Sequence, residues 1–113
     1  WENGGFGPQI LQKAKSKGMA RLALKALALG RWKPGAKRTH PKCWYEPVSD
    51  PALAKLALQF TLNQEITAAV PPGDENIFDL ALDIACGPLP KLQKPELARL
   101  MEAAKASEPI FRA

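Results

Sequence analysis

The fold is decided by residues 50–74, which read DPALAKLALQFTLNQEITAAVPPGD. Asp50 followed by Pro51 is typical of a helix start, because the Asp side chain can cap the first turn and proline has no N–H to lose there. The segment Glu65–Val70 has β-branched residues at three of its six positions and is bounded by turn residues, which predicts a short buried strand. Between them lies an apolar stripe with the spacing of a helix, at Leu53, Leu56, Ala57 and Phe60.

Two further helices are predicted after this strand. The loop Pro71–Asp74 leads into the first of them, and Asp74 is more plausible as its cap than as a ligand group. Two adjoining apolar stripes give that helix a face wide enough to pack on a sheet, and Gly87-Pro88 ends it. Pro95 opens the last helix, which ends before Pro109.

Upstream of residue 50 the pattern is less regular. Pro8 begins a helix that stops at Gly18. Residues 19–29 (MARLALKALAL) fit a strand by their alternation and a helix by their propensity, and the propensity slightly favours the helix. Residues 30–50 form a long basic loop rich in proline.

Strands that alternate with amphipathic helices indicate βαβ units with parallel pairing and a right-handed crossover. We therefore expect an α/β fold in a single domain over residues 1–113. Its parts are a helix plus strand (1–29), the basic loop (30–50), a helix–strand–helix unit (51–86) and a C-terminal helix with a tail (87–113).

Charge is distributed unevenly along the chain, whose net charge is +5. Ten Lys/Arg residues and no acid lie between Asn3 and Tyr45, whereas residues 46–113 carry six Lys/Arg and ten Asp/Glu, a balance of −4. The asymmetry suggests an anionic partner for the first half, which could be nucleic acid, a membrane surface or a phosphorylated cofactor.

The two cysteines, Cys43 and Cys86, are too few and too far apart for a disulfide scaffold, and with His40 they do not complete a metal site. Free thiols, the missing export leader and the absence of a long apolar run predict a cytoplasmic protein with no membrane association. Because the chain starts at Trp1 rather than Met, we expect it to be cut from something longer.

Two stretches resemble aldo/keto reductases. Residues 56–73, LALQFTLNQEITAAVPPG, resemble the last helix-to-strand crossover of that family. Residues 15–27, KSKGMARLALKAL, resemble the passage into its seventh strand, and Trp1-Glu2 would be the tail of the sixth. The resemblance implies that residues 19–27 are a strand and that the fold is the C-terminal part of a (β/α)8 TIM barrel, about its final third.

The resemblance also implies what the chain lacks and what it holds. The family's catalytic Asp, Tyr, Lys and His match no position here, so no catalytic residue and no activity are expected of this chain alone. The family does place contacts to NADP or NAD in this region, and they map onto Lys25, Ala26, Leu27, Pro72, Gly73 and Asn76. The long loop corresponds to one that covers the carbonyl substrate, which makes Trp44 and Tyr45 candidates for the substrate pocket.

One departure concerns the choice of cofactor. Members that favour NADP usually carry Lys or Arg after the last strand, whereas residues 74–76 here are Asp-Glu-Asn, which would repel the 2′-phosphate. Simpler interpretations also stay open. Lys25 could be a solvated lysine and Gly73 could serve only a turn.

Three hypotheses follow. The first is a C-terminal fragment of an NAD(P)-dependent oxidoreductase that contributes cofactor-binding loops. The second is a non-enzymatic basic module for an anionic partner such as RNA, although the prolines of the basic loop make nucleic acid the weaker choice. The third is self-association, since a two-stranded parallel core leaves open edges that a second copy could cover.

Overall fold

The computed structural model describes residues 7–110 of the chain. Trp1-Glu2, interpreted above as a strand tail, lie outside these residues. The elements, in chain order, are α1 (Pro8–Ser16), β1 (Leu22–Leu24), β2 (Ala28–Gly30), β3 (Glu46–Pro47), α2 (Pro51–Leu62), β4 (Ala68–Val70), α3 (Glu75–Cys86) and α4 (Lys94–Ala106).

The helix boundaries follow local chemistry. Asp50 caps α2 by accepting a 2.7 Å hydrogen bond from the Leu53 N–H, and Asp74 caps α3 by accepting one of 3.4 Å from the Ile77 N–H. Both caps were predicted and both are confirmed. Helix α4 begins one residue before the predicted Pro95, with a reciprocal capping box at Gln93 and Glu96.

β1 and β4 form a parallel pair, with Leu22 opposite Ala68 and Leu24 opposite Val70. The ambiguous segment 19–29 is therefore extended over Leu22–Leu24 and not helical, and its predicted parallel partner is correct. Just before the pair, the Thr67 N–H donates to the Arg21 carbonyl at 2.8 Å, and the Arg21 N–H donates to Thr67 Oγ1 at 3.0 Å. These bonds lock the register of two short strands.

The predicted partial TIM barrel is wrong. The described residues hold four short strands in two separate two-stranded sheets, and the second sheet, β2 with β3, is antiparallel. Lys25 has a positive φ of 66°, and its carbonyl accepts a hydrogen bond from the Ala28 N–H, so the chain turns directly after β1. After this turn β2 pairs with β3 in an antiparallel sheet and does not continue a barrel wall. Residues 46–47, which the sequence analysis assigned to the basic loop, form β3.

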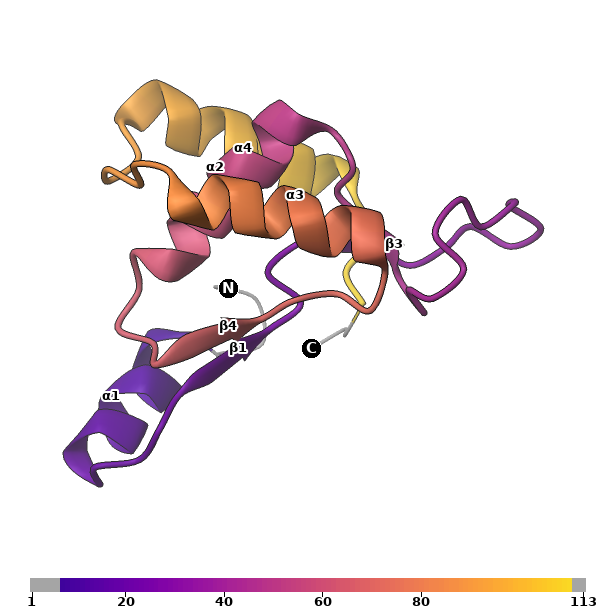
Figure 1. The fold of residues 1–113 in the computed structure, drawn as a ribbon. Coiled ribbons are helices and arrows are strands. Elements are labelled where there is room, and N and C mark those ends of the chain that lie inside the picture. The colour runs from indigo at the N-terminus through magenta and orange to yellow at the C-terminus, as the bar shows by residue number, and fades with distance from the viewer. Residues whose placement is uncertain (1–6, 111–113) are drawn as a thin grey trace.

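A single apolar cluster lies between the strands and the helices. Figure 1 shows α2, α3 and α4 together on one side of the β1–β4 pair, with α1 away from them and the β2–β3 loop projecting outward. Leu27 is 1% exposed, and its carbonyl accepts a 2.8 Å hydrogen bond from the Val48 N–H. The cluster consists of Leu27, Val48, Ala54, Leu58, Ile77 and Ala81. Within residues 7–110, no helix is long and apolar enough to cross a membrane.

The C-terminal segment is fastened at Gly30 and Arg31. The Arg31 side chain donates two hydrogen bonds to the Ile110 carbonyl, at 3.0 and 2.6 Å. A Cβ at Gly30 would lie 2.6 Å from the Glu108 carbonyl oxygen, a backbone atom. Glycine is therefore needed here for close approach.

We predict that Gly30→Ala lowers the free energy of unfolding by about 1–3 kcal/mol, because the 108–110 segment must shift to admit the methyl group. Gly87→Ala is the matched control, since its Cβ would meet nothing closer than 3.5 Å. Urea unfolding of both variants measures the difference. Equal effects of the two substitutions would show that residues 108–110 do not pack as described.

Candidate functional site

The candidate site is a cavity of about 260 Å³ at the carboxyl ends of β1 and β4. Because the two strands are parallel and adjacent, the residues that follow each strand meet at one edge. The residues after β1 supply Lys25, those after β4 supply Pro72 and Gly73, and the loop before β3 closes the third side. The full lining is Leu24, Lys25, Lys42, Cys43, Trp44, Tyr45, Val70, Pro71, Pro72 and Gly73.

Five of the eight residues predicted from the sequence line this cavity. They are Lys25, Trp44, Tyr45, Pro72 and Gly73. The other three lie elsewhere. Ala26 and Leu27 line an apolar cavity beneath the strands, and Asn76 is an exposed residue in the first turn of α3. The turn at Lys25 explains the split, because it directs the two following residues toward the core.

The aromatic side chains form one wall. The rings of Trp44 and Tyr45 meet edge to face, with centroids 5.4 Å apart and planes at 80°. Trp44 is exposed, whereas Tyr45 is buried, and burial raises the pKa of the Tyr45 hydroxyl. The Lys25 ammonium lies 5.2 Å from the centroid of the Trp44 ring, within the range of a cation–π contact. Trp44 thus offers a flat surface beside a positive charge.

Two lysines, Lys25 and Lys42, bring positive charge to the cavity. The Lys42 ammonium donates to Glu75 Oε1 at 2.5 Å, and this hydrogen bond raises the pKa of Lys42. Sequence reasoning placed Lys42 in a basic run but did not single it out. The pairing crosses from the loop to the start of α3, and no local pattern in the sequence indicates it.

The start of α3 has mixed character for an anion. Helix N-termini favour phosphate through their free N–H groups and the helix dipole. Here the Asp74 carboxylate already accepts from the Ile77 N–H, and Glu75 adds a second negative charge, which Lys42 offsets. The end of the cavity nearest Lys25 is therefore the better place for a phosphate.

Cys43 is a buried part of the lining rather than a reactive group. It is 2% exposed, and burial raises the pKa of its thiol. Its carbonyl accepts a 2.9 Å hydrogen bond from the Trp32 indole N–H, which holds the loop over the cavity. His40 contacts Thr39 Oγ1 through Nδ1 at 3.0 Å. No group of three or more His, Cys, Asp or Glu side chains that could hold a metal occurs in residues 7–110.

Comparison of the chain with protein-family models, with curated protein sequences and with solved structures finds no match.

We predict that Cys43 reacts with a thiol reagent far more slowly than the exposed Cys86 in the folded protein. Its raised pKa leaves less thiolate at a given pH, and burial blocks access, so its rate keeps rising with pH above the ordinary thiol value. A Cys86→Ser variant isolates the Cys43 signal, and denaturant should release it. Fast labelling of Cys43 in the folded variant would contradict the buried position.

Proposed function

We propose that the cavity at the ends of β1 and β4 binds the phosphate-bearing part of a nicotinamide dinucleotide, NAD or NADP. One observation carries the proposal. Lys25, Pro72 and Gly73 line a single cavity, although Lys25 lies about 45 residues before the other two. The resemblance to aldo/keto reductases leads us to expect cofactor contacts from both of these segments. The proposal concerns these contacts and does not require a barrel.

The chemistry of the lining suits this ligand. The Lys25 ammonium can pair with a phosphate oxygen, and the exposed face of Trp44 can stack against a ring of the ligand. A Cβ on Gly73 would find only the Lys42 carbonyl, at 3.5 Å, so packing does not require a glycine at this position.

The size of the cavity limits what the chain can do alone. Ordinary small-molecule sites measure about 300–1,000 Å³, and this cavity has about 260 Å³. It can hold only part of a dinucleotide, so we expect weak binding, with Kd on the order of 1 mM. Hydride transfer between a nicotinamide and a carbonyl carbon would need groups that this chain does not supply, and we expect no turnover of aldehydes with NADPH.

A second candidate is binding of a polyanion such as RNA by the β2–β3 loop. Figure 1 shows this loop projecting from the body of the protein. Lys33, Lys37 and Arg38 are exposed on it. Nucleic-acid binding of this kind would depend steeply on salt, because each phosphate contact releases counterions.

We predict that NAD⁺ or NADP⁺ binds the chain and that Lys25→Met weakens binding about tenfold or more, because a hydrogen bond to a charged group contributes about 1.5–3 kcal/mol. Lys55→Met, on the exposed side of α2, is the matched control and should bind like the parent chain. Titration followed by NMR measures the affinities. Failure to bind any dinucleotide at millimolar concentration, together with salt-sensitive binding of single-stranded RNA, would replace this proposal with the second candidate.

A separate prediction concerns the 2′-phosphate. Glu75→Gln should raise the affinity for NADP⁺ about fivefold while leaving that for NAD⁺ nearly unchanged, because it removes a negative charge and releases Lys42. The size corresponds to about 1 kcal/mol for two charges near 4 Å in water. Asp79→Asn, one turn further along α3, is the control. A parallel change in both affinities would show that the 2′-phosphate does not approach Glu75.

A further inference from the structure

We propose that the apolar groove between β4 and α3 is the contact surface for a second copy of this chain. The groove is a cavity of about 210 Å³ lined by twelve residues, all of them alanine, leucine, valine, proline or phenylalanine. It adjoins the candidate cofactor site, with which it shares Val70, Pro71 and Pro72. Its walls are Ala69 to Pro72 beside α3 residues Phe78, Ala81, Leu82 and Ala85, with Ala26, Leu27, Leu58 and Leu62 at its base.

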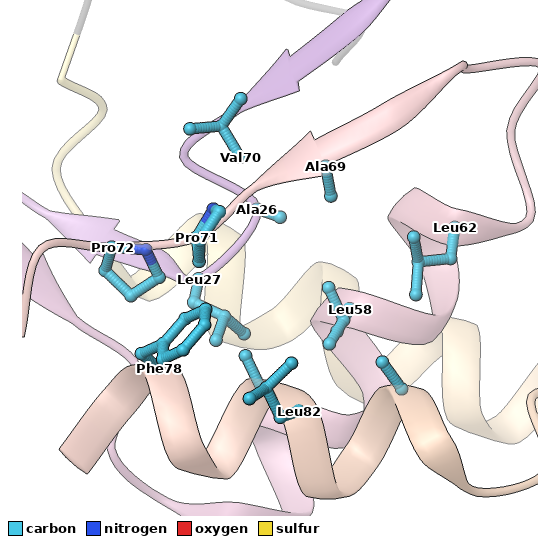
Figure 2. A pocket seen from close by; sticks show the side chains of 12 residues that line it. Ala26, Leu27, Leu58, Leu62, Ala69, Val70, Pro71, Pro72, Phe78 and Leu82 are labelled. Atoms are coloured by element: carbon cyan, nitrogen blue, oxygen red, sulfur yellow. The ribbon is translucent and has the colours of Figure 1, made fainter. Parts of the chain in front are cut away.

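The groove is open to solvent along one side. Figure 2 shows Phe78 on α3 below Pro71 and Pro72, Leu82 further along the same helix, and Leu58 between Ala69 and Leu82. Phe78 and Leu82 are 38% and 45% exposed, and both line the hollow. Contiguous exposed apolar side chains of this kind are typical of surfaces that contact another molecule.

The groove runs along a strand, which favours a polypeptide over a small molecule as its occupant. In the described part of the chain, β4 pairs with β1 alone, so the β4 backbone has a second edge without a strand partner. A small apolar ligand could fill the carbon-lined hollow but could not pair with this backbone. Pro71 and Pro72 have no N–H, so any added strand pairs over Ala68–Val70 and the side chains of α3 contribute most of the contact.

The distribution of charge favours a second copy of this chain over other polypeptides as the occupant of the groove. Asp79 and Asp83 are exposed on α3, next in sequence to Phe78 and Leu82 of the groove. The positive charge that could complement them is concentrated in the first half of the same sequence, which carries ten Lys/Arg between Asn3 and Tyr45 and no acid. Lys13 on helix α1 and Lys17 at its C-terminal cap are exposed, as is Ile10 on the same helix at 51%. A two-fold arrangement would place the basic half of each copy against the acidic half of the other.

The test is the mass of the purified chain in solution, measured by sedimentation equilibrium from micromolar to millimolar concentration. The parent chain is expected to form dimers as concentration rises, and added salt should weaken them. Leu82→Asp is expected to weaken the dimer at least tenfold, because it places a carboxylate in the groove. Leu97→Asp on α4 replaces another exposed leucine, 38% exposed, outside the groove and should leave the dimer intact.

Two results would overturn the proposal. One is a parent chain that stays monomeric at every concentration. The other concerns Leu24→Asp, a variant on the open face of the β1–β4 pair. If Leu24→Asp is monomeric while Leu82→Asp still forms dimers, the contact lies on that open face and not in the groove. Far-UV circular dichroism checks the fold of each variant. If Leu82→Asp does not fold, Phe78→Ala takes its place and must weaken the dimer, and an unchanged dimer would count against the groove.

Discussion

The parallel pairing of β1 with β4 is the contact on which the rest of the structure depends. It joins segments 46 residues apart at Arg21 and Thr67, where each N–H finds an acceptor on the other segment. Each strand has only three residues, so the pair by itself contributes little stability. It persists because α2 and α3 pack beneath it, and it in turn fixes where the residues after each strand emerge. Without this register, Lys25 and Gly73 would not share a cavity.

The parts of the fold that sequence predicted are those with local causes. Asp50 and Asp74 each accept a hydrogen bond from an N–H three residues ahead, so the starts of α2 and α3 are readable from neighbouring residues. The parallel pair was predicted only because the resemblance made residues 19–27 a strand, whereas their propensity slightly favours a helix. The barrel was wrong because closing one requires further parallel strands, and β2 and β3 instead pair with each other. Their pairing brings Ala28 to Pro47 across a long loop, and no residue pattern near either strand indicates it.

The candidate site shows the same division. Its residues after β1 and β4 were predicted from the resemblance to aldo/keto reductases, and the meeting of parallel strand ends at one edge agrees with that expectation. The expectation did not hold for Ala26 and Leu27, which do not line this cavity. Lys25 takes a left-handed conformation that L-residues adopt at a cost of about 1–3 kcal/mol. The chain then turns inward, so Leu27 contributes to the core instead of the site. Nothing in the composition of this segment indicates a turn at a lysine. The Lys42–Glu75 ion pair likewise could not be predicted from the sequence.

The two surfaces meet at a common wall, since Val70, Pro71 and Pro72 line both the candidate cofactor site and the groove. A shared wall could couple binding in the cavity to binding in the groove, because a ligand that shifts the wall on one side would change the shape of the site on the other side. Two consecutive prolines oppose this, since each ring fixes φ near −65° and leaves the segment few alternative conformations. Pro72 is also buried, held between the loop at Cys43 and the base of α3. A stiff wall transmits little conformational change from one site to the other. We therefore expect that dimerisation through the groove leaves the shape of the cavity and its affinity for a dinucleotide nearly unchanged.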